Sequence, residues 1–171
     1  MFDKVSKFNL VNKLIAKESG FEFEREIYSF DTLSKQNRYI VYLDKYNYNL
    51  YVIKFYLKNH QLSEDKFNLL TSLNEVQNIL ATCLEIIILK KKQNPYASFA
   101  FLASRSENEL DKETPKRFKV YSRLIKNMIS PVDFEHFDNS PIGIYLLKNK
   151  LSDFDEVANT YLQMLIDVYT L

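Results

Sequence analysis

Apolar residues between Leu73 and Ile88 recur at steps of three and four, the period of a helix with one face buried. Ser72 to Glu75 matches a capping box, in which a hydroxyl and a carboxylate satisfy free amides of the first turn. Asn94-Pro95 ends the pattern, because a residue before proline is disfavoured in a helix. The apolar series comprises Leu73, Val76, Leu80, Cys83, Leu84, Ile87 and Ile88, with Ile79 and Ile86 beside them. The pattern predicts a long central helix that begins at Ser72.

The segment after this helix predicts a strand, a loop and a second helix. In residues 96–103, Phe99 and Phe101 alternate with small residues, which is typical of a central strand packed on both faces. Residues 104–114 are mostly polar and predict a loop. Residues 115–128 begin with a proline, which fits the first turn of a helix, and continue with a helical apolar period.

The N-terminal region predicts one helix and one strand. Apolar residues from Phe2 to Ile15 follow a helical spacing, and Gly20 is suited to end a helix. Residues 21–30 alternate as a strand, but the alternation slips near Arg25, which a β-bulge would explain.

The remaining patterns predict a mainly antiparallel sheet. Residues 38–44 and 50–57 are rich in Tyr, Ile and Val and predict a hairpin. Further strands are expected at 66–71 and 142–147, with 132–137 as a short strand or turn, and a final helix after Ser152. We therefore expect a single α+β domain over residues 1–171. Its two layers are a sheet of about five strands and a layer with the central and the basic helix, with helices at both termini.

Composition limits the class of protein without naming a function. The chain has 171 residues, 46% of them hydrophobic and 26% charged, which is typical of one globular domain. No apolar run approaches the roughly 20 residues needed to span a bilayer, so no membrane partner is expected. The single cysteine, Cys83, cannot form an internal disulfide, and a cytoplasmic location is expected.

Glycine is scarce, and this argues against nucleotide chemistry. Gly20 and Gly143 are the only two glycines, whereas phosphate-cradling loops use several. A nucleotide loop of the P-loop, Rossmann or protein-kinase type is therefore not expected. No arrangement of residues predicts a catalytic group, a metal site or a cofactor.

One helix carries a concentration of basic residues. From Lys112 to Lys126 there are six bases and one acid. They are Lys112, Lys116, Arg117, Lys119, Arg123 and Lys126, of which four share one helical face. This face would suit phosphates or an acidic protein surface, but it is equally typical of an ordinary solvated helix. Arg117 is alternatively a structural anchor for the preceding loop.

The C-terminal segment has the opposite charge. Residues 130–171 contain seven acids and two bases. The acidic segment and the basic helix could neutralise each other within one molecule or between two copies of a homodimer. The sequence leaves both arrangements open.

A second candidate site is polar. His136 lies between acidic neighbours, including Glu135, and carboxylates beside an imidazole are capable of proton transfer or metal binding. No second histidine stands at metal-ligand spacing, so a structural role is the stronger interpretation. Tyr121, on the basic helix, joins this candidate set.

The C-terminal half resembles a group of small bacterial α+β proteins from Bacteroidetes-like or mobile-element settings, a group without an established activity. The residues that carry the resemblance are Phe99-Ala100-Phe101, Lys116 to Tyr121, Ser130-Pro131, Phe134 to Phe137 and Ile144 to Leu147. The resemblance implies a shared α+β fold and draws attention to Arg117, Tyr121, Glu135 and His136.

These observations favour a non-catalytic protein that binds another macromolecule. The first hypothesis is an inhibitor, immunity protein or regulator of the phage or mobile-element type, acting on a protein partner. The second is a nucleic-acid-binding protein that uses the basic helix at 115–128. The third is a diverged acyltransferase-like enzyme.

Overall fold

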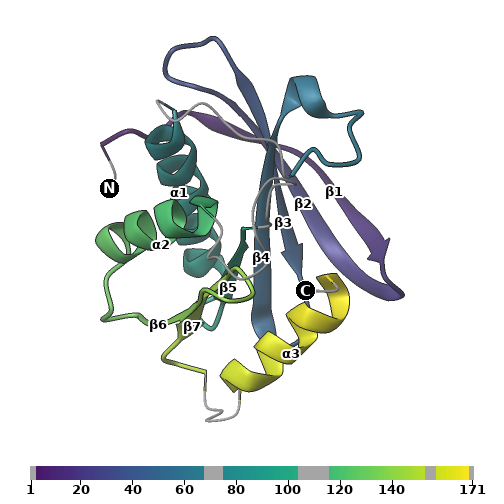
Figure 1. The fold of residues 1–171 in the computed structure, drawn as a ribbon, viewed down its shortest axis with the longest axis vertical. Helices are drawn as coiled ribbons and strands as arrows, with labels where there is room; N and C mark the ends of the chain where they lie inside the picture. Colours follow the sequence, from purple (N-terminus) through teal and green to yellow (C-terminus); the bar gives the residue numbers. More distant parts are fainter. Residues whose placement is uncertain (1–2, 68–74, 104–115, 153–156, 170–171) are drawn as a thin grey trace.

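The computed structural model of the chain describes residues 3–67, 75–103, 116–152 and 157–169, and one mixed sheet lies at its centre (Figure 1). The strands in these residues are β1 (Phe8–Glu18), β2 (Phe21–Asp31), β3 (Arg38–Lys45), β4 (Leu50–Leu57), β5 (Ser98–Leu102), β6 (Phe134–Asn139) and β7 (Ile144–Asn149). The helices are α1 (Val76–Gln93), α2 (Lys116–Met128) and α3 (Val157–Tyr169), and 3-10 turns occupy Asn47–Asn49 and Lys58–His60.

The order of strands across the sheet is β1-β2-β3-β4-β5-β7-β6. All neighbours are antiparallel except β4 and β5, which run parallel and are connected through α1. A parallel pair needs such a crossover, because the chain must return to the same end of the sheet before the second strand begins.

The expected two layers, a sheet of about five strands packed against a long central helix and the basic helix, are wrong. The described residues form seven strands, and the sheet, not a helix, is the central layer. Alternate residues of β4 point to opposite faces: Tyr51 and Ile53 pack in a cluster with α1 and α2, whereas Leu50 and Val52 pack with α3. Because both faces of the sheet are apolar, helices cover both of them.

The expected N-terminal helix is also wrong. This segment forms β1, which pairs with β2 through a tight turn at Ser19 and Gly20, both at positive φ. Positive φ at both central residues is the geometry of a two-residue hairpin, so Gly20 serves a turn and does not end a helix. The spacing of apolar residues misled the prediction, because most residues of β1 are exposed and do not follow a buried face.

The β-bulge predicted near Arg25 lies elsewhere. The register of the β1–β2 pair shifts between Leu10 and Asn12, on β1. The alternation slips at Arg25 because this charged side chain occupies an inward-facing position, described below.

Several expected elements are confirmed. The hairpin predicted at 38–44 and 50–57 is β3 and β4, and the strand predicted at 96–103 is β5. The strand predicted at 142–147 corresponds to β7, and the short strand or turn at 132–137 corresponds to β6. The strand expected at 66–71 starts in a turn at Lys66 and Phe67, and the rest of it, like Ser72 and the loop at 104–114, lies outside the described residues.

Most residues of helix α1 are buried. Cys83, Leu84 and Ile87 are fully buried against the sheet, and Lys90 makes an ion pair with Glu26 of β2 at 2.8 Å. None of the described helices has the length and apolarity that a membrane-spanning helix requires.

We expect Leu84→Ala to lower the free energy of unfolding by about 2–5 kcal/mol, because it removes buried methyl groups and leaves a cavity. Leu62→Ala is the matched control: Leu62 is 97% exposed, and its truncation should change stability by less than about 0.5 kcal/mol. Urea denaturation measures both, and equal losses would contradict the packing of α1.

Candidate functional site

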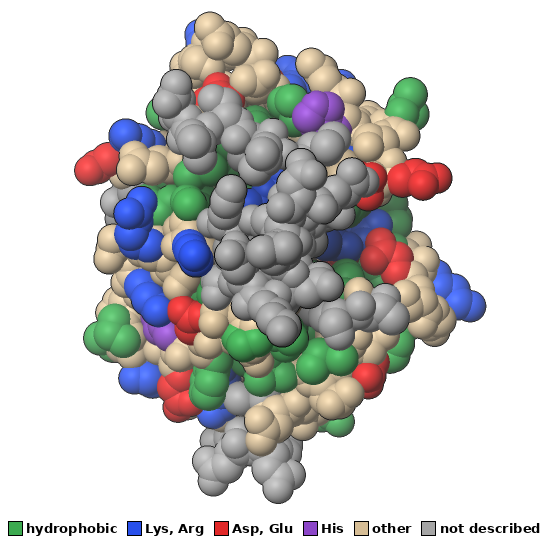
Figure 2. All heavy atoms as spheres, in the orientation of Figure 1, with side chains coloured by type: hydrophobic (Ala, Val, Ile, Leu, Met, Phe, Trp, Pro, Cys, Tyr) green, Lys and Arg blue, Asp and Glu red, His purple; other side chains and the backbone are tan. Residues whose placement is uncertain are grey.

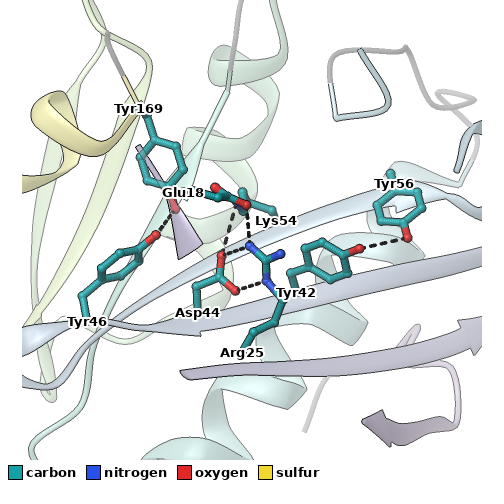
Figure 3. A network of polar contacts seen from close by, with 8 residues as sticks. All are labelled: Glu18, Arg25, Tyr42, Asp44, Tyr46, Lys54, Tyr56 and Tyr169. Atoms are coloured by element: carbon teal, nitrogen blue, oxygen red, sulfur yellow. Dashed lines mark hydrogen bonds and ion pairs between the residues drawn. The ribbon is translucent and has the colours of Figure 1, made fainter. Parts of the chain in front are cut away.

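A cluster of four charged side chains lies on the α3 face of the sheet (Figure 3). At its centre Asp44 of β3, with no exposed surface, lies directly across from Arg25 of β2. Arg25 donates from Nε to Oδ1 at 2.6 Å and from Nη2 to Oδ2 at 2.8 Å. This two-pronged geometry is the strongest that an arginine and a carboxylate can form.

Two further strands complete the cluster. Glu18, the last residue of β1, accepts a hydrogen bond from Arg25 at 2.7 Å. Lys54 of β4 places Nζ 3.3 Å from Asp44 and 3.4 Å from Glu18. Two cations and two carboxylates therefore balance in formal charge.

Aromatic rings surround the cations of the cluster. The Arg25 guanidinium lies 4.2 Å from the ring centre of Tyr42, whose hydroxyl lies 3.3 Å from that of Tyr56. Lys54 Nζ lies 5.2 Å from the ring centre of Phe67 and 5.0 Å from that of Tyr169. Ring faces attract cations, so these contacts offset part of the hydration that the buried charges lose.

The environment of the cluster shifts the pKa values of its members. Burial alone would raise the pKa of Glu18, but the hydrogen bond from Arg25 and the charge of Lys54 outweigh it and leave the pKa lowered. Burial alone would lower the pKa of Arg25, but hydrogen bonding to Asp44 and the charge of Asp44 outweigh it and leave the pKa raised. Both groups therefore remain charged at neutral pH. Burying charge is costly, and perturbed charged groups beside a cavity are typical of functional sites.

A cavity of about 320 Å³ adjoins the cluster. Strands β4 and β5 pair only from Leu50 with Ser98 to Ile53 with Phe101. Beyond Ile53, β4 continues to Leu57 and pairs, among the described strands, with β3 alone. The cavity is lined by Glu18, Ile53, Lys54, Phe55, Phe67, Phe101, Leu102, Ala103, Tyr121, Ile142, Gly143 and Tyr169. It thus lies at the carboxyl end of β5, beside the middle of β4, where the pairing of these two strands has ended.

The predicted basic face is only partly free of acidic neighbours. Lys119, Arg123 and Lys126 are exposed, and Figure 2 shows basic side chains over the α2 region with acidic ones among them. Lys126 makes an ion pair with Asp138 of β6 at 2.7 Å, so part of the acidic segment does meet the basic helix within one molecule. Lys112 lies outside the described residues, and for Lys116 only the backbone is described.

Arg117 differs from the other bases of α2. Its Nη1 donates to the backbone carbonyl of Phe67 at 2.7 Å. Phe67 follows the long turn after β4 and lines the cavity. Arg117 therefore anchors the segment at Phe67, whereas the loop at 104–114 that it was expected to anchor lies outside the described residues.

Tyr121, Glu135 and His136 make separate contacts. Tyr121 is buried and lines the cavity, and burial raises the pKa of its hydroxyl. His136 Nδ1 lies 2.7 Å from the hydroxyl of Tyr145, and Glu135 lies 3.5 Å from Lys148. Successive residues of a strand point to opposite faces, so the two side chains diverge, although both border one open surface pocket beside Lys126 and Lys150.

The pKa of His136 is lowered by burial and by the positive charges of Lys126 and Lys150. A search of the described residues finds no group of three or more His, Cys, Asp or Glu side chains arranged for a metal ion. The lowered pKa favours the neutral form of His136, and its contact with Tyr145 joins β6 to β7.

Sequence reasoning missed Glu18, Arg25, Asp44 and Lys54 as one group. The signal in the sequence was a charged residue at an inward-facing position on each of several strands. The sequence analysis identifies only one of these positions, the slip in alternation near Arg25. The four residues span 37 positions of sequence, and only the strand register brings them together.

Comparison of the chain with protein-family models, with curated proteins and with solved structures finds no match. The resemblance of the C-terminal half therefore carries no further argument. What the protein does must be inferred from its own geometry.

Asp44→Asn should lower the free energy of unfolding by about 3–5 kcal/mol, because it leaves the buried cations of Arg25 and Lys54 poorly compensated. Asp31→Asn is the matched control. Asp31 pairs with Arg38 across the same two strands, but both side chains are about half exposed, so its loss should be much smaller. Denaturant titration measures both variants, and similar losses would contradict the importance of the cluster.

The lowered pKa of Glu18 predicts a dependence of stability on pH. Because the pKa is lower in the folded than in the unfolded state, ionised Glu18 stabilises the fold above its ordinary pKa of 4.5. This contribution disappears as the pH falls through the lowered pKa. Glu18→Gln should therefore be less stable at neutral pH and lose less stability on acidification than the parent.

Glu22→Gln, a change at an exposed carboxylate on the same hairpin, is the control for this pH experiment. Its stability should fall with acid as steeply as that of the parent. A Glu18→Gln variant whose acid curve parallels the parent would show that Glu18 gains nothing from its ion pairs.

Proposed function

We propose that the chain is a non-catalytic protein-binding domain whose partner docks on the free edge of β1. The observation that carries this proposal is the exposure of that strand. β1 is an outer strand of eleven residues, and Leu10, Val11 and Ile15 are 47%, 60% and 62% exposed. Leu14 and Phe21 add partly exposed apolar surface to the same hairpin.

Such an edge is unusual in a protein that acts alone. An outer strand presents unpaired N–H and C=O groups, and long apolar edges are templates for another strand. Proteins commonly block them with proline, charge or a short strand. β1 is long and contains no proline. Its main protection against strand addition is the charge of Lys13 and Lys17 and the bulge between Leu10 and Asn12.

Strand addition is a recognised mode of protein binding, in which backbone hydrogen bonds supply affinity and alternate side chains supply specificity. The β1 edge offers both components. The basic face of α2 supports a partner less strongly, because Lys126 is paired and Arg117 contacts Phe67.

Ile15→Lys tests this proposal. Ile15 lies across from Glu24, so a lysine is compatible with the monomer, while it places a charge on the docking edge. Affinity capture from a bacterial lysate and size measurement of the purified protein should both be performed on parent and variant. We expect the parent to form a complex, and we expect Ile15→Lys to lower the affinity of that complex about tenfold or more.

Leu62→Lys is the control, because Leu62 is highly exposed and lies in the turn after β4, a strand that is not a neighbour of β1 in the sheet. It should retain the complex. A parent that stays monomeric and recovers no partner would refute the proposal. So would a complex that Ile15→Lys leaves unchanged.

A further inference from the structure

The cavity beside the charged cluster has an apolar body and one polar end. Most of its wall is formed by aliphatic and aromatic side chains, including Ile53, Phe55 and Phe101. Glu18, Lys54 and Tyr169 form the polar end. Its volume of about 320 Å³ is at the lower end of the range for small-molecule sites.

Lys54 is the group in this wall best placed to meet a ligand. Its side chain is only 9% exposed, and its ammonium has three N–H donors. Among the described residues, its polar contacts are Asp44 at 3.3 Å and Glu18 at 3.4 Å. Both distances exceed the range of about 2.7–3.2 Å for a good N–H···O hydrogen bond. Two acceptors at these distances leave at least one of the three N–H donors for an oxygen in the cavity.

The charge balance of the cluster indicates which kind of ligand oxygen could accept a hydrogen bond from Lys54. Arg25 and Lys54 already neutralise Asp44 and Glu18. A ligand carboxylate would add a third negative charge beside two carboxylates, and a ligand ammonium would approach two cations. A neutral acceptor avoids both repulsions, and a carbonyl oxygen is the strongest common one.

We propose that this cavity binds a small neutral ligand with an apolar or aromatic body, whose carbonyl oxygen accepts a hydrogen bond from Lys54 Nζ. This proposal does not rest on the proposed protein-binding edge of β1 and goes beyond it. An amide, a ketone or the carbonyl of an acyl group meets this description.

Three probes of similar size separate the chemical requirements. N-benzylacetamide supplies a ring and a neutral carbonyl, butylbenzene supplies the apolar body alone, and 3-phenylpropionate supplies a carboxylate. Titrations of the ¹⁵N-labelled protein are followed by NMR. We expect N-benzylacetamide to bind most tightly and to shift the amide signals of Leu102, Ala103 and Gly143, and 3-phenylpropionate to bind most weakly.

Lys54→Met tests the donor, because it removes the ammonium and keeps an unbranched apolar side chain. The affinity for N-benzylacetamide should fall about tenfold, the usual scale for one lost hydrogen bond to a charged group, while that for butylbenzene should not fall. Equal affinity of parent and variant for the amide would overturn the assignment to Lys54.

Ala103→Leu provides a second test that leaves the charged cluster intact, in case Lys54→Met does not fold. Ala103 is buried and lines the cavity, so a larger side chain should occupy it and abolish binding of all probes. Probe binding that survives Ala103→Leu, or parent spectra that show no shifts around the cavity, would refute the site. Neither result would bear on the β1 edge, which is tested by capture of a protein.

Discussion

The fully buried carboxylate of Asp44 imposes the strictest constraint on this fold. An ionised group without exposed surface requires charged partners, and Arg25 and Lys54 supply them from the strands on either side. A slip of one residue in the β2–β3 register would move Arg25 to the other face of the sheet and leave Asp44 unpaired. Glu18 extends the same constraint to β1. One cluster thus fixes the alignment of the first four strands, which an apolar face alone specifies less sharply.

The sheet consists of two parts joined by a short parallel contact. Strands β1 to β4 form an antiparallel meander, and β5, β7 and β6 form a second antiparallel group. Only Leu50 to Ile53 of β4 pair with β5, after which the two strands no longer run together. The cavity follows from this short pairing, because the backbone beyond Ile53 has side chains from both groups around it. Helix α1 makes this arrangement possible, because it returns the chain to the end of the sheet at which β4 begins, so that β5 runs parallel to β4.

The sequence predicted those strands and helices in which the order of apolar and polar residues reflects which side chains are buried. β3 and β4 have enclosed apolar residues, so their content of Tyr, Ile and Val was informative, as was the alternation in β5. The bases of α2 lie on a helix, as expected. β1 could not be recognised in this way, since Leu10, Val11 and Ile15 are apolar yet exposed, so their spacing does not indicate which face is buried. The strand count failed for the same reason.

The candidate site was harder to predict than the fold. Arg25, Asp44 and Lys54 are ordinary charged residues in sequence, and their importance comes from inward-facing positions on three neighbouring strands. An inward charge on one strand requires an opposite charge on the next, so such residues are informative as a set. The basic helix drew attention instead because its charges are adjacent in sequence, although Lys126 and Arg117 are engaged within the molecule.

Glu18 connects the two proposed binding surfaces physically. It ends the exposed strand β1, and its carboxylate both lines the cavity and accepts from Arg25 and Lys54. A strand added to β1 that displaces Glu18 would change one of the two acceptors of Lys54, and so the donor capacity that Lys54 offers a ligand. Linkage requires the effect to be reciprocal: a ligand that draws Lys54 away from Glu18 must alter the affinity of the β1 edge by the same factor. If Glu18 instead stays fixed, held mainly by its 2.7 Å hydrogen bond from Arg25, the two surfaces act independently.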